Sequence, residues 1–272
     1  GAVGVTGTGA SNTVSEDADL LLAVGTRLQD FTTASWTLFQ NASKTLIGLN
    51  TQVFDASKHQ ALPLVADARV GLEELSANLG KWTAPAAWTA KAKAARADWI
   101  KVAETYTAAS NAELPSDAQV VGSVQRALGR DVIGICAAGG LPGEMHKLWQ
   151  ASFPGSYHME YGFSCMGYEM AGGLGIKMAR PDKDVVVMVG DGSYMMMNSE
   201  LSTAVMLGHK LTIVLLDNRG YGCINRLQHA TGGERFNNLY DYNVKQEVSP
   251  AIDFAAHARA QGAIALKVKS LA

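Results

Sequence analysis

Two apolar runs, each followed by polar residues and glycines, constrain the fold of this chain most strongly. The first run, Val185–Val189, leads into Gly190-Asp191-Gly192-Ser193, and the second, Leu211–Leu216, leads into Asp217-Asn218-Arg219-Gly220. Short continuous apolar runs are typical of buried strands in a parallel sheet, where ligands bind beyond the carboxyl ends of the strands. About one strand–helix–strand unit separates Asp191 from Asn218. We therefore expect Asp191 and Asn218 to meet at one edge of a sheet.

Oxygen atoms dominate the chemistry expected at that edge. Asp191 supplies carboxylate oxygens, Asn218 supplies an amide oxygen, and no side chain obstructs the carbonyl of Gly220. Such ligands suit Mg²⁺, which usually completes its coordination with phosphate and water. Gly192 and Ser193 open the next helix, whose first backbone N–H groups favour a phosphate. The pattern indicates a metal-bridged diphosphate, and the alternative is a simple turn with Asn218 as a cap.

The motif that begins at Gly190 and ends at Asn218 resembles the cofactor motif of thiamine diphosphate enzymes, which begins Gly-Asp-Gly and ends Asn-Asn. This resemblance implies that thiamine diphosphate is the cofactor. It also implies that Asp191, Asn218 and the carbonyl of Gly220 hold Mg²⁺ against its diphosphate. Asp217 stands where the family often has the first Asn, a position that is not the usual metal ligand.

Two strings around the motif are more specific. Residues 194–200 read Tyr-Met-Met-Met-Asn-Ser-Glu, and residues 220–226 read Gly-Tyr-Gly-Cys-Ile-Asn-Arg. They resemble the enzymes, related to acetolactate synthase, that hydrolyse a cyclic 1,2-diketone in bacterial inositol breakdown. The resemblance implies a cyclic polyol diketone as substrate, with ring opening of trihydroxycyclohexane-1,2-dione to 5-deoxyglucuronate. Two alternatives stay open: an acetolactate synthase-like carboligase, and a non-catalytic phosphate- or nucleotide-binding module.

Two further segments extend the expected cofactor site. Backbone N–H groups at Gly139 and Gly140 follow a predicted strand and can approach a phosphate, although a plain strand-to-helix turn fits equally well. The string from Ser164 to Gly167 resembles the family's turn that props the cofactor into a bent shape, with Met166 as the wedge and the Ser164 carbonyl accepting from the pyrimidine amino group. Met166 as an ordinary core residue is the alternative. The expected cofactor contacts are Gly139, Gly140, Ser164, Met166, Gly190, Asp191, Gly192, Ser193, Asn218 and Gly220.

We assign no catalytic residue within this chain. The family's activating glutamate lies in an N-terminal pyrimidine-binding domain, and we expect the chain to begin after that domain. Glu160 and Glu169 do not match the motif of that glutamate. His158 and Glu160 share one face of an extended segment and form a candidate acid–base pair, with a structural histidine as the commoner case. Candidate substrate contacts beyond the metal loop are Tyr221, Asn225 and Arg226.

Strands that alternate with helical spacers predict an α/β fold with two doubly wound parallel-sheet domains. We expect a partial central domain over 1–80, a helical linker over 81–114, and a diphosphate-binding domain over 115–272 that is truncated at its C-terminus. Strands are predicted at 19–25, 45–50, 62–67, 131–136, 185–189 and 211–216. Helices are predicted at 71–79, 88–106 and 169–179, and a further helix runs to residue 128 from a cap at Ser116 or Asp117. Proline restricts the third strand to an edge, and the helix over 88–106 carries an apolar stripe formed by Trp88, Ala92, Ala95, Trp99, Val102 and Tyr106.

The glycine-rich stretch 4–12 lacks the Gly-x-Gly-x-x-Gly pattern after a strand, so it does not require a nucleotide. Residues 25–32 resemble the central domain of the acetolactate synthase group, some members of which bind a flavin or an adenine nucleotide. We favour the purely structural interpretation for this domain.

The 272 residues are 47% hydrophobic and 18% charged, with a net charge of −2, which is ordinary globular composition. This charge gives no electrostatic case for binding nucleic acid or an anionic membrane, and the sequence has no apolar run of membrane-spanning length. Its three cysteines form neither a zinc pattern nor a disulfide framework, so a reducing cytoplasm fits best. Both ends suggest a piece of a longer protein that cannot turn over alone. The family resemblance implies a homo-oligomer with the site at a subunit interface.

Overall fold

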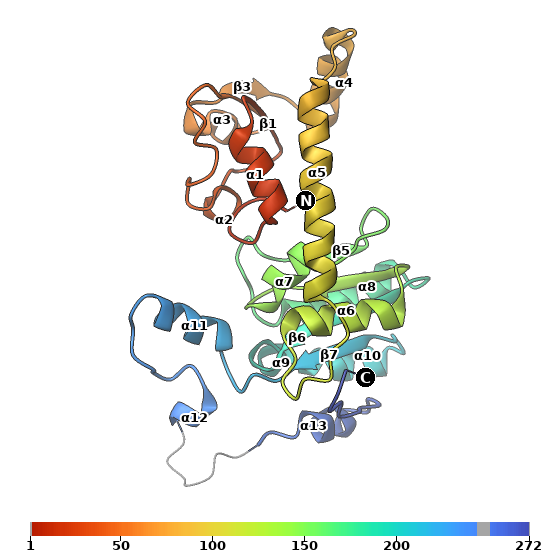
Figure 1. Cartoon of the computed structure of the whole chain (residues 1–272). Coiled ribbons are helices and arrows are strands. Elements are labelled where there is room, and N and C mark those ends of the chain that lie inside the picture. Colours follow the sequence, from red (N-terminus) through yellow and green to blue (C-terminus); the bar gives the residue numbers. More distant parts are fainter. Residues whose placement is uncertain (1, 244–250, 272) are drawn as a thin grey trace. The chain divides into compact units, whose positions relative to one another are not determined.

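The computed structural model describes residues 2–243 and 251–271, and the chain divides into two compact units, Gly1–Thr105 and Tyr106–Ala272. Each unit contains a parallel sheet whose strands alternate with helices (Figure 1), so the predicted α/β class is confirmed. The division between the units falls within the segment 81–114 that we expected to be a linker. The limits of the three expected domains stay predictions.

The sheet of the first unit has three parallel strands in the order β1-β2-β3. These are β1 (Leu20–Val24), β2 (Thr45–Asn50) and β3 (Leu62–Val65), close to the predicted ranges. Within the described residues β3 pairs with β2 alone, so Pro63 lies in an edge strand, where a missing N–H does not interrupt the sheet. The helices of this unit are α1 (Gly9–Asp17), α2 (Asp30–Thr33), α3 (Val53–Ala56), the 3₁₀ turn η1 (Lys58–Gln60) and α4 (Ala68–Leu79).

The glycine-rich stretch at the start forms a closed turn that leads into α1. The side chain of Asn12 accepts a hydrogen bond from the Gly4 N–H at 2.9 Å and donates to the Gly4 carbonyl at 3.0 Å. Thr8 caps the helix by accepting from the Ser11 N–H. Within the described residues no strand precedes this turn, so the strand-to-helix context of a dinucleotide loop is missing.

The long helix α5 (Ala86–Tyr106) confirms the predicted helix and corrects its apolar stripe. Trp88, Ala92, Ala95 and Trp99 are half-buried, as expected. The expectation for Val102 and Tyr106 is wrong, because these residues are 41% and 58% exposed. With 3.6 residues per turn, the buried face that contains residues 88, 92, 95 and 99 continues to the half-buried Ala103 instead.

The sheet of the second unit has four parallel strands in the order β5-β4-β6-β7. They are β4 (Val132–Cys136), β5 (Tyr157–Met159), β6 (Asp184–Gly190) and β7 (Thr212–Leu216). All five residues of β4 are buried, and so are Val185–Val189 of β6. The chain passes from β4 outward to β5 and then returns to β6 and β7 on the other side. This reversal of direction is the doubly wound arrangement expected for this segment.

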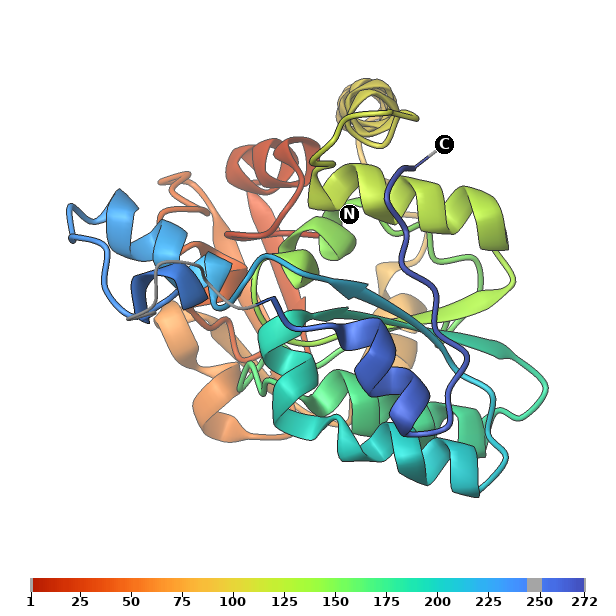
Figure 2. The ribbon, with the colours of Figure 1, turned by 90° about the horizontal axis from the view of Figure 1, so that it is seen from below.

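Helices cover both faces of this sheet (Figure 2). One face carries α6 (Asp117–Leu128) and α7 (Leu141–Leu148), and the other carries α8 (Tyr168–Ala179), α10 (Ser199–Met206) and α13 (Phe254–Ala260). A hydrophobic cluster joins the second face to its helices, consisting of Ile135, Met170, Val185, Val187, Val189, Tyr194 and Leu201. The remaining helices are α9 (Asp191–Met197), α11 (Gly222–Ala230) and α12 (Tyr240–Asn243). A complete capping box, formed by Ser116 and Gln119, begins α6 at the predicted position.

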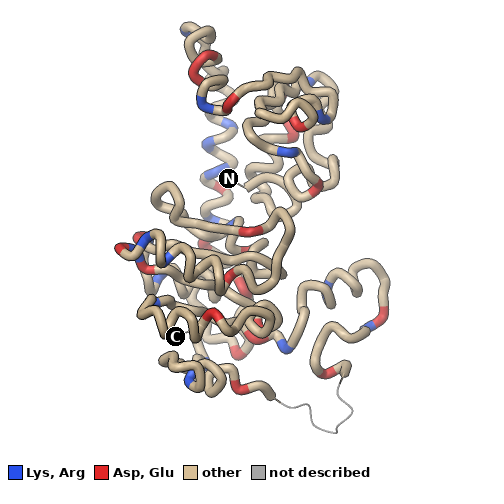
Figure 3. Tube along the Cα trace, turned by 180° about the vertical axis from the view of Figure 1, so that it is seen from behind, with Lys and Arg blue, Asp and Glu red and all other residues tan. Residues whose placement is uncertain are grey.

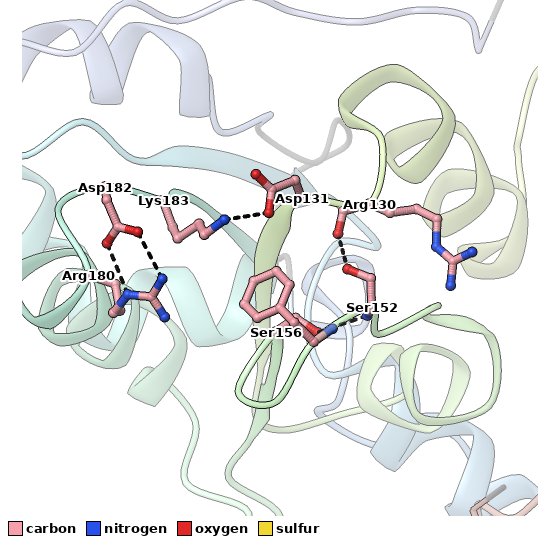
Figure 4. Close-up of polar contacts among 8 residues, drawn as sticks. Arg130, Asp131, Ser152, Ser156, Arg180, Asp182 and Lys183 are labelled. Atoms are coloured by element: carbon pink, nitrogen blue, oxygen red, sulfur yellow. Dashed lines mark hydrogen bonds and ion pairs between the residues drawn. The ribbon is translucent and has the colours of Figure 1, made fainter.

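Polar contacts tie together the loops at the amino ends of β4 and β6 (Figure 4). Lys183, just before β6, forms an ion pair with Asp131, just before β4. The hydroxyl of Ser152 donates to the carbonyl of Arg130, and Arg180 contacts Asp182 through two hydrogen bonds of 2.9 and 2.8 Å. At this amino edge of the sheet, the loops contact one another through their polar groups. The glycine-rich loops lie at the opposite edge, after the carboxyl ends of the strands.

Acidic and basic side chains are interspersed along the chain (Figure 3), in keeping with a net charge of −2. Among the described helices, none combines the length and the apolar character needed to cross a membrane. The longest of them, α5, carries several lysines.

Candidate functional site

Three loops meet where the direction of the second sheet changes. The loop after β4 leads into α7 on one face, and the loops after β6 and β7 lead into helices that start at the same edge. In open parallel sheets, a ligand binds at such a reversal point, beyond the carboxyl ends of the strands. The loops contribute residues 138–141, 190–193, 216, 218, 220–224 and 226 to a shared cavity of about 180 Å³.

Asp191 is the most deeply placed polar residue of this edge, since its exposed fraction is 0%. Its carboxylate accepts hydrogen bonds from the backbone N–H of Gly220, at 2.7 Å, and of Asn218, at 3.4 Å. The predicted meeting of Asp191 and Asn218 at one sheet edge is therefore what the structure shows. The contact joins the loop after β6 to the loop after β7, which fixes the separation of the two polar groups.

The loop after β7 places Asn218 and Gly220 beside this carboxylate through their backbone N–H groups. Gly220 has φ of +137°, and a β-carbon there would lie 2.6 Å from the carbonyl oxygen of Asn238. Only glycine fits this close approach without strain. The side-chain oxygen of Asn218 accepts from the Gly222 N–H at 3.3 Å. Within the described residues, the carbonyl of Gly220 accepts no hydrogen bond, so its lone pairs are available.

Burial raises the pKa of the Asp191 carboxyl above its ordinary value, although the Gly220 N–H acts in the opposite direction. The neighbouring Asp217 adds to the rise. Among the described residues, only backbone N–H groups donate hydrogen bonds to this carboxylate, and no lysine or arginine forms an ion pair with it. A buried carboxylate without an ion-pair partner is unfavourable, so a bound cation would stabilise this site.

The donor set at this edge fits Mg²⁺ better than a transition metal. It comprises a carboxylate, an amide oxygen and a backbone carbonyl, all hard oxygen ligands. Within residues 2–243 and 251–271, no cluster of three or more His, Cys, Asp or Glu side chains is placed to hold a metal. The site would therefore need oxygen atoms from a ligand or from water to complete the coordination of the metal.

Gly192 lines the cavity at a point where a side chain would not fit. A β-carbon at this position would lie 2.9 Å from the Tyr221 ring and 3.3 Å from the terminal carbon of Met166. The Met166 side chain thus reaches the start of α9 from a different loop. As predicted, Gly192 and Ser193 lie in the first turn of a helix, and both are buried.

The turn that contains Ser164 is held by a carboxylate from outside the cavity. Glu160 accepts hydrogen bonds from the backbone N–H groups of Phe163, at 2.9 Å, and Cys165, at 2.6 Å. Ser164 lies between them with φ of +54°, a left-handed conformation that is uncommon for a serine. The surrounding hydrogen bonds stabilise this conformation, which orients the Ser164 carbonyl.

Gly139 and Gly140 line the cavity from the loop after β4. Gly140 is the N-cap of α7, and a β-carbon on it would lie 2.3 Å from a guanidinium nitrogen of Arg226. The absence of a side chain at Gly140 therefore lets Arg226 pack against the backbone. Asp117 also lines this part of the cavity, where burial raises the pKa of its carboxyl and the charge of Arg226 opposes that rise.

All ten residues that we expected to contact the cofactor line this one cavity: Gly139, Gly140, Ser164, Met166, Gly190, Asp191, Gly192, Ser193, Asn218 and Gly220. Two of the three candidate substrate contacts, Tyr221 and Arg226, line it as well. The third, Asn225, does not, although its side-chain oxygen is buried and has no hydrogen-bond partner among the described residues. The sequence analysis missed the lining residues Asp117, Ala138, Leu141, Leu216, Gly222, Cys223 and Ile224.

The candidate acid–base pair is not assembled in the structure. His158 contacts the carbonyl oxygen of Gly155 through its Nε2 atom at 3.1 Å, and Glu160 is used by the turn described above. Neither side chain lines the cavity. The structural interpretation of His158 therefore accounts for its contacts.

Comparisons with known proteins point in the same direction as this geometry. The family described as "Thiamine pyrophosphate enzyme, C-terminal TPP binding domain" matches residues 137–272, and its counterpart for the central domain matches residues 1–75. Thiamine pyrophosphate is another name for thiamine diphosphate. The first of these matches covers half of the chain and includes the loops that form the cavity.

Several curated bacterial proteins are similar to the whole chain. A 3D-(3,5/4)-trihydroxycyclohexane-1,2-dione hydrolase of Bacillus anthracis is 38% identical over 302 aligned residues, which include 100% of this chain and 47% of the relative. The hydrolases of the same name from Bacillus cereus and from Bacillus thuringiensis (strain Al Hakam) have the same identity and coverage, also over 302 residues. The chain thus spans about half the length of the curated relatives it matches.

Proposed function

Because the chain belongs to the thiamine pyrophosphate enzymes, we propose that the cavity of its second unit holds the diphosphate of this cofactor through Mg²⁺. The metal ligands in this proposal are the Asp191 carboxylate, the Asn218 side-chain oxygen and the Gly220 carbonyl. The observation that carries it is a fully buried carboxylate at the reversal point of the sheet, without an ion-pair partner in the described residues, which contacts the backbone of Asn218 and Gly220.

The remaining cavity residues have distinct roles in this proposal. Gly192 and Ser193 present backbone N–H groups to the diphosphate, and Gly192 keeps its part of the cavity free of a side chain. Gly139 and Gly140 approach the same group from the loop after β4. Met166 and the Ser164 carbonyl support and orient the thiamine rings, since both belong to the turn that faces the start of α9.

We propose hydrolytic ring opening of a cyclic polyol 1,2-diketone, trihydroxycyclohexane-1,2-dione, to 5-deoxyglucuronate as the reaction of the whole protein. When bound, the cofactor supplies a carbon nucleophile and an electron sink for cleavage of a bond beside a carbonyl. Water adds across the bond between the two carbonyls, so that one carbon becomes a carboxylic acid and the other an aldehyde. Support comes from the relatives named trihydroxycyclohexane-1,2-dione hydrolase and from the strings at residues 194–200 and 220–226.

The family resemblance also supports a setting for this reaction. We propose a cytoplasmic homo-oligomer in inositol catabolism, with the active site between subunits. The activating glutamate would come from a pyrimidine-binding domain and not from this chain. The isolated chain is then expected to bind the cofactor but not to turn over, and full activity without added polypeptide would contradict this expectation.

Product analysis tests the proposed reaction. Protein that contains this chain and the pyrimidine-binding domain is incubated with thiamine diphosphate and Mg²⁺, once with the cyclic diketone and once with pyruvate. The proposal predicts ring-opened acid from the diketone and no acetolactate from pyruvate. Acetolactate without ring opening would identify a carboligase instead. A non-catalytic nucleotide module predicts no product and nucleotide binding that survives Asp191→Ala.

A further inference from the structure

Glu169 is a buried carboxylate that the proposed function does not use. It lies in the first turn of α8, and its exposed fraction is 1%. Its neighbours in α8 are mainly apolar and glycine residues. Burying a carboxylate is unfavourable by several kcal/mol unless hydrogen bonds or a counter-charge compensate it. An acidic residue in this place therefore needs a physical reason.

The contacts of Glu169 reach three separate segments of the cavity. Its Oε1 atom accepts a hydrogen bond from the Ala138 N–H at 3.2 Å, and its Oε2 atom accepts from the Gly167 N–H at 2.9 Å. The hydroxyl of Ser193 also interacts with this carboxylate and lowers its pKa. These partners come from the loop after β4, the turn before α8 and the first turn of α9.

Each of these partners lies beside, or belongs to, the lining of the cavity. Ala138 and Ser193 line it, and Gly167 directly follows the lining residue Met166. One carboxylate thus fixes the relative positions of the three segments on which the proposed cofactor site depends. Among the described residues, Glu169 forms no ion pair with a lysine or arginine, so its hydrogen-bond partners are neutral groups.

Helix capping alone does not account for this arrangement. A glutamate in the first turn that accepts from the N-cap N–H, here Gly167, is a common capping contact. It explains one of the contacts, whereas the bonds to Ala138 and Ser193 cross to other elements. A capping role would affect the stability of α8, and a bridging role would affect how well the cavity binds a ligand.

We propose that Glu169 is a positioning residue, which holds the loop after β4, the Met166 turn and the start of α9 in their ligand-binding arrangement before the cofactor enters. This inference rests on the proposed cofactor site. Segments that are already ordered lose less conformational freedom on binding, so the cofactor binds more tightly.

The first test compares cofactor binding by two matched variants of the chain. Glu169→Gln preserves the shape of the side chain but replaces one accepting oxygen by an amide group that cannot accept. The control, Glu144→Gln, makes the same change in α7, where the carboxylate is partly exposed and pairs with Lys147. Thiamine diphosphate with Mg²⁺ is titrated into each protein by calorimetry. We expect Glu169→Gln to raise the Kd at least ten-fold and Glu144→Gln to change it less than two-fold.

The outcomes separate this inference from the proposed function. A ten-fold rise in Kd, with the unliganded circular dichroism spectrum unchanged, supports the positioning role. An unchanged Kd in folded Glu169→Gln overturns that role and leaves the cofactor site intact. If the wild-type chain binds no thiamine diphosphate even with a pyrimidine-binding domain supplied, both the positioning role and the cofactor site that it serves are overturned.

Amide hydrogen exchange of the unliganded wild-type chain provides a second test that needs no variant to fold. The positioning role predicts that the N–H groups of Ala138 and Gly167 are already protected from exchange before thiamine diphosphate and Mg²⁺ are added. Fast exchange that becomes slow only on cofactor addition would show that the ligand, and not Glu169, orders these segments.

Discussion

Asp191 combines burial that is unfavourable for folding with the metal-binding role proposed for it. Its carboxylate is fully buried, and two backbone N–H groups compensate it only in part. The same burial makes it a strong ligand for a hard cation, because water does not compete there. The residue therefore links the stability of the unliganded chain to the binding of metal and diphosphate.

Asp191→Asn should abolish most of the stabilisation that Mg²⁺ and thiamine diphosphate give. At a ligand concentration of 100 Kd, binding contributes about 2.7 kcal/mol and raises the melting temperature of a unit of this size by roughly 5–10 °C. The variant should show less than a third of that shift in a thermal melt. Asp184→Asn is the matched control, since Asp184 lies at the exposed amino end of the same strand. An equal shift in wild type and Asp191→Asn would contradict the metal assignment.

The buried Glu169 predicts a specific pH dependence of stability. Burial raises the pKa of its carboxyl, and the hydrogen bonds from Ala138, Gly167 and Ser193 oppose that rise. The folded chain therefore holds this proton more tightly than the unfolded chain. The stabilising contribution is complete below the ordinary glutamate pKa and is lost as the pH rises through the elevated value.

Denaturant titrations at pH 4.5 and pH 7 measure this effect. Other carboxyls, such as that of Asp182 with a pKa lowered to about 2 by Arg180, act in the opposite direction, so the useful quantity is the difference between two proteins. The free energy of unfolding of wild type should fall relative to that of Glu169→Gln as the pH increases. A difference that stays constant, or that grows in favour of wild type, would contradict a raised pKa.

At the scale of elements, the glycines of α8 divide into two kinds. A β-carbon at Gly173 would lie 2.4 Å from the Val187 side chain of β6, which shows that the helix packs directly on the sheet. Gly175, one half-turn further, is exposed and has no atom within 4 Å of such a β-carbon. Close packing therefore explains the first glycine and not the second.

Alanine substitutions at these two positions should have opposite effects. Gly175→Ala should stabilise the chain by up to about 1 kcal/mol, because alanine has the higher helix propensity. Gly173→Ala should destabilise it by about 1–3 kcal/mol, since overpacking against Val187 exceeds that gain. Equilibrium unfolding in urea measures both. Equal stabilisation by the two variants would show that α8 does not pack on β6 as closely as described.

The elements that the sequence predicted well share one property: their pattern is local. The apolar runs of β4, β6 and β7 and the Ser116 cap of α6 are visible in a few adjacent residues. The short helices α2 and α3 have no such local pattern. The buried face of α5 differs from the predicted apolar stripe at Val102, because the exposure of this residue depends on contacts with distant parts of the chain. Tertiary contacts determine these short helices and the buried face of α5, and such contacts cannot be read from a local sequence pattern.

The candidate site likewise contains residues that a local pattern predicts and residues whose role depends on tertiary contacts. The ten lining residues that we expected to contact the cofactor were predictable because they follow strands or match a family motif, which places them at one edge of a sheet. The bridging role of Glu169 was not predicted, since its partners Ala138 and Ser193 belong to other elements, far from it in the chain. A single acidic residue in an otherwise apolar and glycine-rich helix was the available signal.

At the scale of the whole molecule, the two compact units have separate cores and separate sheets. The cavity, with the residues proposed to contact the cofactor, belongs to the unit Tyr106–Ala272. Ligand binding stabilises only the folding unit that it contacts. The chain therefore allows a test of which unit carries the binding function.

Differential scanning calorimetry should resolve two unfolding transitions. Thiamine diphosphate with Mg²⁺ should raise the temperature of one of them and leave the other within about 1–2 °C of its starting value. Asp191→Asn should remove the shift without creating a new one. A ligand-induced rise in both transitions to the same extent would contradict a cofactor site confined to the second unit.

The most direct test of the central claim, a metal-bridged diphosphate at the edge formed by Asp191 and Asn218, is calorimetric titration of thiamine diphosphate into this chain. The titration is made with Mg²⁺ and repeated after addition of a chelator, in wild type and in Asn218→Ala. We predict binding that requires Mg²⁺, disappears with the chelator and is at least ten-fold weaker in Asn218→Ala. Binding that persists without metal, or no binding even when a pyrimidine-binding domain is supplied, would contradict the claim.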